Sequence, residues 1–178
     1  MSETAAAVRM LTAEQAYACR SALADILVDC VEGGASVSFM APLTQDKAQA
    51  FWTGVADSVA ACGRRLLVAQ DPESGDLLGT VQLVLAQSEN QPHRGDIAKM
   101  LVRRRARRRG IGASLMQAAE DAARADGKTL LVLDTATGSD AERLYTRLGW
   151  TRVGTIPGYA LWPDGRPCAT TYYYKRLG

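Results

Sequence analysis

Hydrophobic positions along the chain occur in segments of strand-like spacing and segments of helix-like spacing. Residues 4–11 are predicted as a short strand. Apolar positions at helical spacing then follow a Thr-x-x-Gln capping box at Thr12 as far as Gly33, which predicts one helix. A second helix is predicted from about residue 46 to residue 62, and the small-residue segment 33–40 between the two helices is predicted to be a loop.

The second half of the chain supplies most of the predicted sheet. Two β-rich runs, 65–70 and 77–86, flank a turn that contains Pro and Gly, and they are predicted to form a hairpin. The later elements are predicted as a strand at 96–102, a helix at 110–126, a strand at 129–135, a helix at 139–148, and strands at 150–153 and 169–175. The order β-α-α-β-β-β-α-β-α-β-β predicts an α/β (α+β) fold with a mixed sheet and helices on both faces.

Length and composition favour a single domain over residues 1–178. With 47% hydrophobic and 22% charged residues, the chain can bury a real core, which excludes a disordered protein. The longest uncharged stretch, residues 33–45, is far shorter than the ~20 apolar residues that a membrane-spanning helix needs. Because the first residues lack a basic region followed by an apolar one, we expect a cytoplasmic protein without a membrane partner.

The cysteine and histidine content argues against several chemistries. Four cysteines lie far apart without a Cys-x-x-Cys pair, and His93 is the single histidine. We expect no metal site, since zinc needs clustered Cys and His ligands, and no nucleophilic triad, since it would depend on His93 alone. The cysteines are interpreted as small buried apolar residues.

Positive charge is concentrated at one place in the chain. Six of the 21 basic residues are arginines within segment 103–109, and without them 15 basic residues face 19 acidic ones, a net charge of −4. A local cluster on a mildly acidic protein favours a local anionic ligand over a broad nucleic-acid surface. A solvated charge cluster and a nucleic-acid-binding module built on the same arginines stay open as alternatives.

The arginine run leads into a glycine-containing turn between a predicted strand and a predicted helix. Gly110 and Gly112 permit close backbone approach, and the first N–H groups of the helix, together with its dipole, favour an anion. Arginine side chains add charge-assisted hydrogen bonds. The segment therefore predicts a pyrophosphate cradle. It is not a Walker loop, and Leu115 replaces the last glycine of the dinucleotide fingerprint.

Two motifs give the chain a family resemblance. Arg107-x-x-Gly110-x-Gly112 after a strand resembles the Q/R-x-x-G-x-G/A motif of the GNAT superfamily of N-acetyltransferases, and Ala141-x-x-Leu144-Tyr145-x-x-Leu148-Gly149-Trp150 resembles its second landmark. Segments 33–37, 133–135, 151–154, 157–159 and 163–165 extend the resemblance to the tabtoxin resistance protein subgroup over nearly the whole chain. The resemblance implies a GNAT fold, acetyl-CoA as cosubstrate and a small-molecule amine as acceptor.

The resemblance also assigns residues to an acetyl-CoA site. In the superfamily, backbone N–H groups at the positions of Leu101 and Val102 bind the pantetheine arm and polarise the thioester carbonyl. Many members carry Asn seven residues before the tyrosine of the second landmark, where this chain has Gly138. The implied cofactor-binding residues are Leu101, Val102, Arg107, Arg108, Arg109, Gly110, Ile111, Gly112 and Ala113.

Attack of an amine on a thioester requires a neutral nitrogen, and an amine with a pKa of ~8–10 is mostly protonated at neutral pH, so a base is needed. Asp96 and Asp134 match the two acidic positions that the tabtoxin resistance subgroup uses for catalysis, with Asp96 standing where that subgroup has Glu. Which of them is the base, and whether a water intervenes, stays open. Tyr145 matches the tyrosine often assigned as the acid that protonates the departing thiolate. The alternatives are a helix cap for Asp134 and core packing for Tyr145.

An acceptor site is expected beside this crevice. The candidate acceptor-binding residues are Gly34, Ser36, Phe39, Met40 and Tyr159, with ordinary packing as the alternative for the larger ones. We expect an N-acetyltransferase that acts on an amino-acid-like toxin or antibiotic and so confers resistance. A protein lysine or N-terminal acetyltransferase is the rival, which a broad groove would favour over a pocket closed by loop 33–40. No nucleic-acid partner is expected, and a homodimer stays open.

Overall fold

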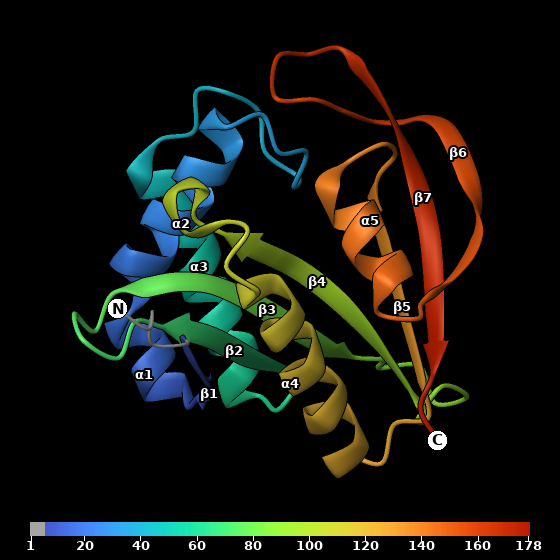
Figure 1. The fold of residues 1–178 in the computed structure, drawn as a ribbon. Helices are drawn as coiled ribbons and strands as arrows, with labels where there is room; N and C mark the ends of the chain where they lie inside the picture. The colour runs from blue at the N-terminus through green and yellow to red at the C-terminus, as the bar shows by residue number, and fades with distance from the viewer. Residues whose placement is uncertain (1–5) are drawn as a thin grey trace.

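The computed structural model describes residues 6–178, and this part of the chain forms a seven-stranded mixed sheet with helices on both faces (Figure 1). This confirms the predicted fold class. Residues 4 and 5 of the predicted first strand lie outside the described residues. The strands are β1 (Ala7–Leu11), β2 (Arg64–Gln70), β3 (Leu77–Leu85), β4 (Arg94–Val102), β5 (Leu130–Ala136), β6 (Thr151–Leu161) and β7 (Pro167–Arg176). They lie in the order β1-β2-β3-β4-β5-β7-β6.

Helices cover the sheet from two sides. The helices are α1 (Ala13–Ala18), α2 (Arg20–Glu32), α3 (Gln45–Ala60), α4 (Ile111–Ala125) and α5 (Asp140–Arg147), and a 3₁₀ turn, η1 (Arg104–Ala106), follows β4. The predicted capping box is confirmed, because Thr12 Oγ1 accepts the N–H of Gln15 and Gln15 accepts the N–H of Thr12. The prediction of one continuous helix is wrong. The backbone departs from helical geometry at Cys19, where ψ is 0°, and this divides α1 from α2.

Two hydrophobic clusters hold the layers together. Helices α1–α3 pack on one face of the sheet around the fully buried Trp52, while α4 packs on the other face through Leu115 and Met116. Each large apolar side chain buried in this way stabilises the fold by about 1.5–3 kcal/mol. Gly79 permits the close approach of both β4 and α4, because a Cβ there would lie 2.7 Å from the carbonyl oxygen of Leu101 on β4 and 3.1 Å from Cδ1 of Leu115 on α4. The start of α4 is thereby held beside the end of β4.

Strands β4 and β5 pair at one end only. They are parallel, and their pairing covers Arg94 to Asp96 on β4 and Leu130 to Val132 on β5. Beyond that point the two strands diverge, as Figure 1 shows. The register of β4 against β3 also shifts between Thr80 and Gln82, and Lys99 in the shifted segment has a left-handed φ of 48°. On the side that faces β5, the second half of β4 therefore borders an opening, while its other side still pairs with β3.

Strand β6 is much longer than predicted. It continues to Leu161, whereas the predicted strand ended at residue 153. The register against β7 shifts between Ile156 and Ala160, so Pro157, Gly158 and Tyr159 are taken up as an irregularity in the strand. Because β6 is the edge strand, Pro157 removes no essential ladder hydrogen bond. The result is a long β6–β7 hairpin that carries Tyr159 toward the opening between β4 and β5.

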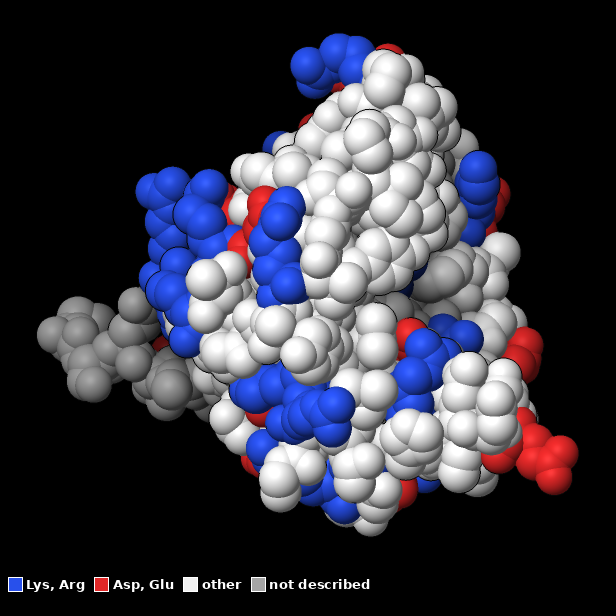
Figure 2. Space-filling model, turned by 90° about the vertical axis from the view of Figure 1, so that its right-hand side faces the viewer, with Lys and Arg blue, Asp and Glu red and all other residues white. Residues whose placement is uncertain are grey.

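The hairpin side of the molecule carries few charges. Figure 2 shows a broad uncharged surface over this side, with basic side chains in separate patches around it. The exposed large apolar residues of β6 are Val153, Ile156, Tyr159 and Leu161. No continuous basic stripe runs across the face that Figure 2 presents.

Candidate functional site

A cavity of about 1400 Å³ opens where β4 and β5 diverge. Loop 33–40, the bulged half of β4, the start of α4, the end of β5, α5 and the end of β6 form its walls. The predicted site residues that line it are Gly34, Ser36, Phe39, Met40, Leu101, Val102, Arg107, Arg108, Gly110, Ile111, Gly112, Ala113, Asp134, Tyr145 and Tyr159. The structure thus brings most of the predicted site together, and two predicted residues, Asp96 and Arg109, lie outside this lining.

The start of α4 presents backbone N–H groups to the cavity. Arg108 and Gly110 both have left-handed backbone, with φ of 64° and 78°, and Gly110 has no side chain that could cap the helix. Ser114 donates to the carbonyl oxygen of Gly110, so the N–H groups of residues 111–113 precede the first bond of the helical ladder. Successive N–H groups at a helix start form a favourable environment for an anion. The start of α4 is therefore suited to bind an anion, and the pyrophosphate cradle at this place stays a prediction.

The first three arginines of the basic run are bound to neighbouring parts of the protein. Arg104 Nε lies 2.8 Å from Oδ1 of Asp29, and Arg105 lies 2.7 Å from a carboxylate oxygen of Asp76. Arg103 donates to the carbonyl oxygen of Leu77 on β3. These side chains fasten the turn after β4 to α2 and β3. Their ion pairs reduce the positive charge that the run offers to a nucleic acid.

The last three arginines have different surroundings. Arg107 Nε donates to the carbonyl oxygen of Val102 at 3.2 Å, which fixes the turn between β4 and α4. Arg108 lines the main cavity. Arg109 instead lines a smaller cavity of about 360 Å³ beside Asp71. Arg108 and Arg109 are neighbours in the turn before α4, yet their side chains line two different cavities.

Asp134 lies at the end of β5 and faces the main cavity. Its carboxylate accepts a hydrogen bond from Oγ1 of Thr170 at 3.0 Å, and the side chain is otherwise accessible. The position is two residues beyond Val132, the last residue of β5 that pairs with β4. Asp134 therefore stands where the sheet has opened, with room for a ligand group beside its carboxylate.

Asp96 lies deeper, where β4 and β5 still pair. It is opposite Val132, and its carboxylate lies 3.3 Å from the guanidinium of Arg94. Burial raises the pKa of Asp96, Arg94 opposes this shift, and the negative charge of Asp134 adds to it. The two carboxylates are therefore close enough to interact electrostatically, but only Asp134 reaches the cavity wall.

Tyr145 on α5 lines the cavity from a buried position. Its ring packs near Trp150 and Tyr173, each with a centroid distance of 6.1 Å. Burial raises the pKa of Tyr145 well above the usual range of a phenol, and the charge of Asp134 acts in the same direction. The hydroxyl is thus held in its protonated form, in which it can donate a proton or a hydrogen bond.

Lys99 is a cavity residue that the sequence analysis did not identify. Its Nζ donates to Oγ of Ser38 at 3.0 Å and lies 5.8 Å from the ring centre of Phe51. Burial lowers the pKa of Lys99, the charge of Asp134 opposes this, and the charge of Arg64 adds to it. The available signal was a lysine within the otherwise uncharged segment 97–102 of a central strand.

Loop 33–40 is joined to the β6–β7 hairpin across the mouth of the cavity. Ser36 Oγ donates to the carbonyl oxygen of Leu161 at 2.8 Å, and the N–H of Ala41 donates to that of Pro163 at 3.0 Å. On the hairpin, Tyr172 donates to the hydroxyl of Tyr159 at 2.9 Å. The cavity is consequently enclosed on the side away from α4.

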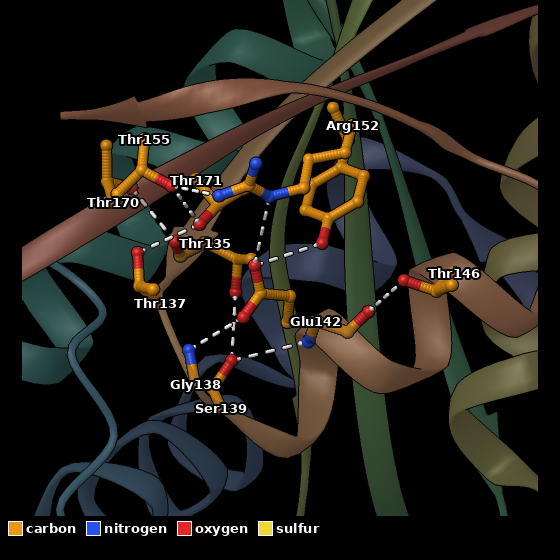
Figure 3. Close-up of polar contacts among 11 residues, drawn as sticks. Thr135, Thr137, Gly138, Ser139, Glu142, Thr146, Arg152, Thr155, Thr170 and Thr171 are labelled. Atoms are coloured by element: carbon orange, nitrogen blue, oxygen red, sulfur yellow. Dashed lines mark hydrogen bonds and ion pairs between the residues drawn. The ribbon is translucent and has the colours of Figure 1, made fainter.

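A polar network fixes the turn between β5 and α5 (Figure 3). Glu142 accepts the N–H of Gly138 at 2.7 Å and the hydroxyl of Tyr173 at 3.0 Å. Burial raises the pKa of Glu142, but its hydrogen bonds outweigh burial and hold that pKa below the usual value. Ser139 caps the start of α5, because its hydroxyl oxygen accepts the N–H of Glu142, while the Glu142 carboxylate accepts the N–H of Gly138 instead of that of Ser139. The network locks the turn, with Gly138 at φ 80°, against β7.

Other chemistries find little support in the described range. Within residues 6–178, no three His, Cys, Asp or Glu side chains are grouped so that they could hold a metal ion. In the same range, no helix is both long enough and apolar enough to cross a membrane. His93 is exposed in the turn before β4. The interpretation of all four cysteines as buried is right for Cys30 and Cys168 and wrong for the other two, because Cys62 is exposed and Cys19 is only partly buried.

Comparisons with known proteins point to one family. A family model described as "Acetyltransferase (GNAT) family" matches residues 23–150. The Salmonella typhimurium protein yncA, solved with its cofactor acetyl-CoA, has a TM-score of 0.78 at 20% identity over 98% of this chain and 95% of that chain.

Two further solved structures have the same overall fold. A phosphinothricin acetyltransferase from Sinorhizobium meliloti, in complex with acetyl-CoA, has a TM-score of 0.80 at 18% identity over 98% of this chain and 90% of that chain. A ribosomal-protein-alanine N-acetyltransferase from Brucella melitensis has a TM-score of 0.77 at 22% identity over 96% and 99%. At these identities the similarity establishes a shared fold.

Proposed function

Because this chain belongs to the acetyltransferase (GNAT) family, we propose that it transfers the acetyl group of acetyl-CoA to the amine of a small molecule, an amino-acid-like toxin or antibiotic. The observation that carries this proposal is the enclosure of the cavity by loop 33–40. Hydrogen bonds from Ser36 and Ala41 join that loop to the β6–β7 hairpin, and a bound polypeptide would have to displace it. A cavity bordered on this side by a loop that is bonded to the hairpin favours a small acceptor over a protein lysine or N-terminus.

The donor site in this proposal is the start of α4 together with the end of β4. Acetyl-CoA supplies a thioester, whose carbonyl carbon is the electrophile. The N–H groups of residues 111–113 and the side chain of Arg108 bind the pyrophosphate, since all of them line the cavity. Leu101 and Val102 lie where β4 has lost its β5 neighbour, so their backbone groups can contact the pantetheine arm and the thioester oxygen.

Proton transfer in this proposal is divided between two side chains. Asp134 accepts the proton of the acceptor amine, directly or through a water, because it is the predicted carboxylate that lines the cavity. The neutral amine then attacks the carbonyl carbon, the C–S bond breaks, and Tyr145 donates a proton to the departing thiolate. The raised pKa of Tyr145 keeps this proton on the enzyme until the thiolate forms. The nitrogen loses its second proton as the amide forms, and a proton taken up from solvent restores the phenol of Tyr145.

Two observations favour the amino-acid-like acceptor among small amines. The residues of loop 33–40 that resemble the tabtoxin resistance subgroup line the cavity, including Gly34 and Ser36. The Sinorhizobium meliloti protein of the same fold is a phosphinothricin acetyltransferase by name. Resistance to a toxin or antibiotic of this class is the biological role that we propose.

Calorimetric titration with acetyl-CoA and a thiol-release screen test the proposal. The acceptors are amino acids, β-lactam toxins, aminoglycosides, polyamines and peptides. We expect acetyl-CoA binding that weakens in the Arg108→Ala variant, and turnover with an amino-acid-like amine. Turnover with peptides alone would overturn the small-molecule proposal. Salt-dependent oligonucleotide binding in a protein that does not bind acetyl-CoA would overturn the acetyltransferase mechanism.

A further inference from the structure

Within residues 6–178, Lys99 carries a positive charge into the cavity and forms no ion pair with a carboxylate. Its side-chain nitrogen contacts the hydroxyl of Ser38, through one hydrogen bond, and the face of the Phe51 ring. An ammonium group has three donors, and a neutral hydroxyl satisfies only one of them. A largely enclosed cation with so few partners costs free energy, which a bound anion would offset.

The surroundings of Lys99 place it on the acceptor side of the cavity. Ser38 belongs to loop 33–40, and Phe51 belongs to α3 on the sheet face opposite α4. The pyrophosphate cradle lies at the start of α4, where Arg108 and the helix N–H groups already supply positive potential. Lys99 is therefore not needed for the diphosphate, and its charge is available to the second substrate.

Lys99 and Asp134 face the same opening from two diverging strands. Lys99 lies on the bulged part of β4, and Asp134 lies at the end of β5, so a cation and an anion line one cavity without forming an ion pair of 4.0 Å or less in the described residues. A ligand with a positive group near Asp134 and a negative group near Lys99 would match both charges. Complementary charges of this kind affect which ligand is preferred more than how tightly a ligand binds.

We propose that Lys99 and Ser38 form a subsite for an anionic group of the acceptor, a carboxylate carried close to the amine that is acetylated. This inference rests on the proposed function and adds to it the residue that selects the substrate. Ser38 holds the Lys99 ammonium and offers its own hydroxyl to the anion. Lys99 has a left-handed backbone and lies where the register of β4 against β3 shifts. An irregularity of this kind changes the direction of a side chain relative to a regular strand, and here the side chain lines the cavity.

The first test compares acceptors that differ only in the anionic group. Amino acids, their carboxamides and their decarboxylated amines are assayed by thiol release with the wild type, Lys99→Met and Lys99→Arg. We expect the wild type to prefer the free acids. Lys99→Met should lose about 10- to 100-fold in kcat/KM for the acids, the range for a hydrogen bond to a charged group, and little for the amides. Lys47→Met, which removes an exposed lysine on α3 outside the cavity lining, should behave as the wild type.

The second test needs no turnover. The CoA-bound protein, labelled at its lysine side chains, is titrated with an N-acetylated amino acid and with the corresponding amide, and the Lys99 signal is followed by NMR. We expect the acid, and not the amide, to shift the Lys99 signal. A shift without any turnover would support the anion subsite while refuting the proposed function. Equal response to acid and amide, or an unchanged acid preference in Lys99→Met, would overturn the anion subsite even if small amines are acetylated.

Discussion

Replacing Asp134 by Asn is the sharpest test of the proposed proton transfer. The amide oxygen of Asn can still accept the hydrogen bond that Thr170 donates at 3.0 Å, so the side chain keeps its place at the end of β5. The substitution removes the basicity and the negative charge. We therefore expect a folded protein that binds acetyl-CoA as the wild type does and is impaired in the chemical step.

The expected loss in the Asp134→Asn variant follows from the role of the base. A positioned general base contributes about 100- to 10,000-fold, so kcat/KM for the amine should fall by that factor, which corresponds to about 2.7–5.4 kcal/mol of transition-state stabilisation. The lost charge also removes the interaction that opposes the lowering of the Lys99 pKa. The affinity for acetyl-CoA should change little, because the donor cradle lies at the start of α4.

The assay is thiol release at saturating acetyl-CoA with the amine varied, together with calorimetry for acetyl-CoA and a thermal melt. Asp121→Asn is the matched control, since it removes an exposed carboxylate of α4 that does not line the cavity. A kcat/KM for Asp134→Asn within about threefold of the wild type would refute the assignment of Asp134 as the base, because it corresponds to a change of less than about 0.7 kcal/mol in activation free energy.

Three further outcomes are expected. Tyr145→Phe should lower kcat by about 100-fold with acetyl-CoA affinity unchanged, measured by steady-state thiol release, and undiminished turnover would reduce Tyr145 to a packing residue. The KM of a carboxylate-bearing acceptor should rise as the pH rises through the lowered pKa of Lys99, because the ammonium is charged only below that pKa. In the Lys99→Arg variant, whose guanidinium stays charged, KM should rise less with pH. Glu120→Ala should lower the free energy of unfolding by about 3 kcal/mol in urea titrations, because Glu120 is buried and accepts two hydrogen bonds from Lys175. The double variant Glu120→Ala, Lys175→Met should recover part of this loss, because it leaves no unpaired charge.

The sequence predicts most of the fold because its elements carry strong local signals. The periodic apolar positions placed α3 and α4 close to their observed bounds, and the turn that contains Pro and Gly did the same for β2 and β3. The break at Cys19 has no such signal, since no Gly or Pro stands there. The extension of β6 could not be predicted because the local sequence there is typical of another structure. Residues 157–159 have the composition of a loop, and only pairing with β7 keeps them in the strand.

The candidate site divides in the same way. The residues of the glycine turn could be predicted because glycine marks both places where a side chain fits badly, the left-handed backbone at Gly110 and the close packing of Gly112 against Leu144. The position of Lys99 could not, because a left-handed residue within a strand is set by its register against β3 and no glycine marks it. Arg109 was grouped with Arg108 by adjacency, whereas the turn into α4 directs the two to different cavities.

The two aspartates were equivalent in the sequence, and the divergence of β4 from β5 makes them different. Asp96 pairs with Val132, the last point at which the strands are joined, so its carboxylate is confined beside Arg94 within the sheet. Asp134 stands two residues past that point, where the opening begins. If the strands stayed paired for two more residues, Asp134 would lie within the sheet as Asp96 does. Access of a ligand to Asp134 therefore depends on where the sheet opens, and Asp96 acts on that carboxylate through the repulsion between the two negative charges.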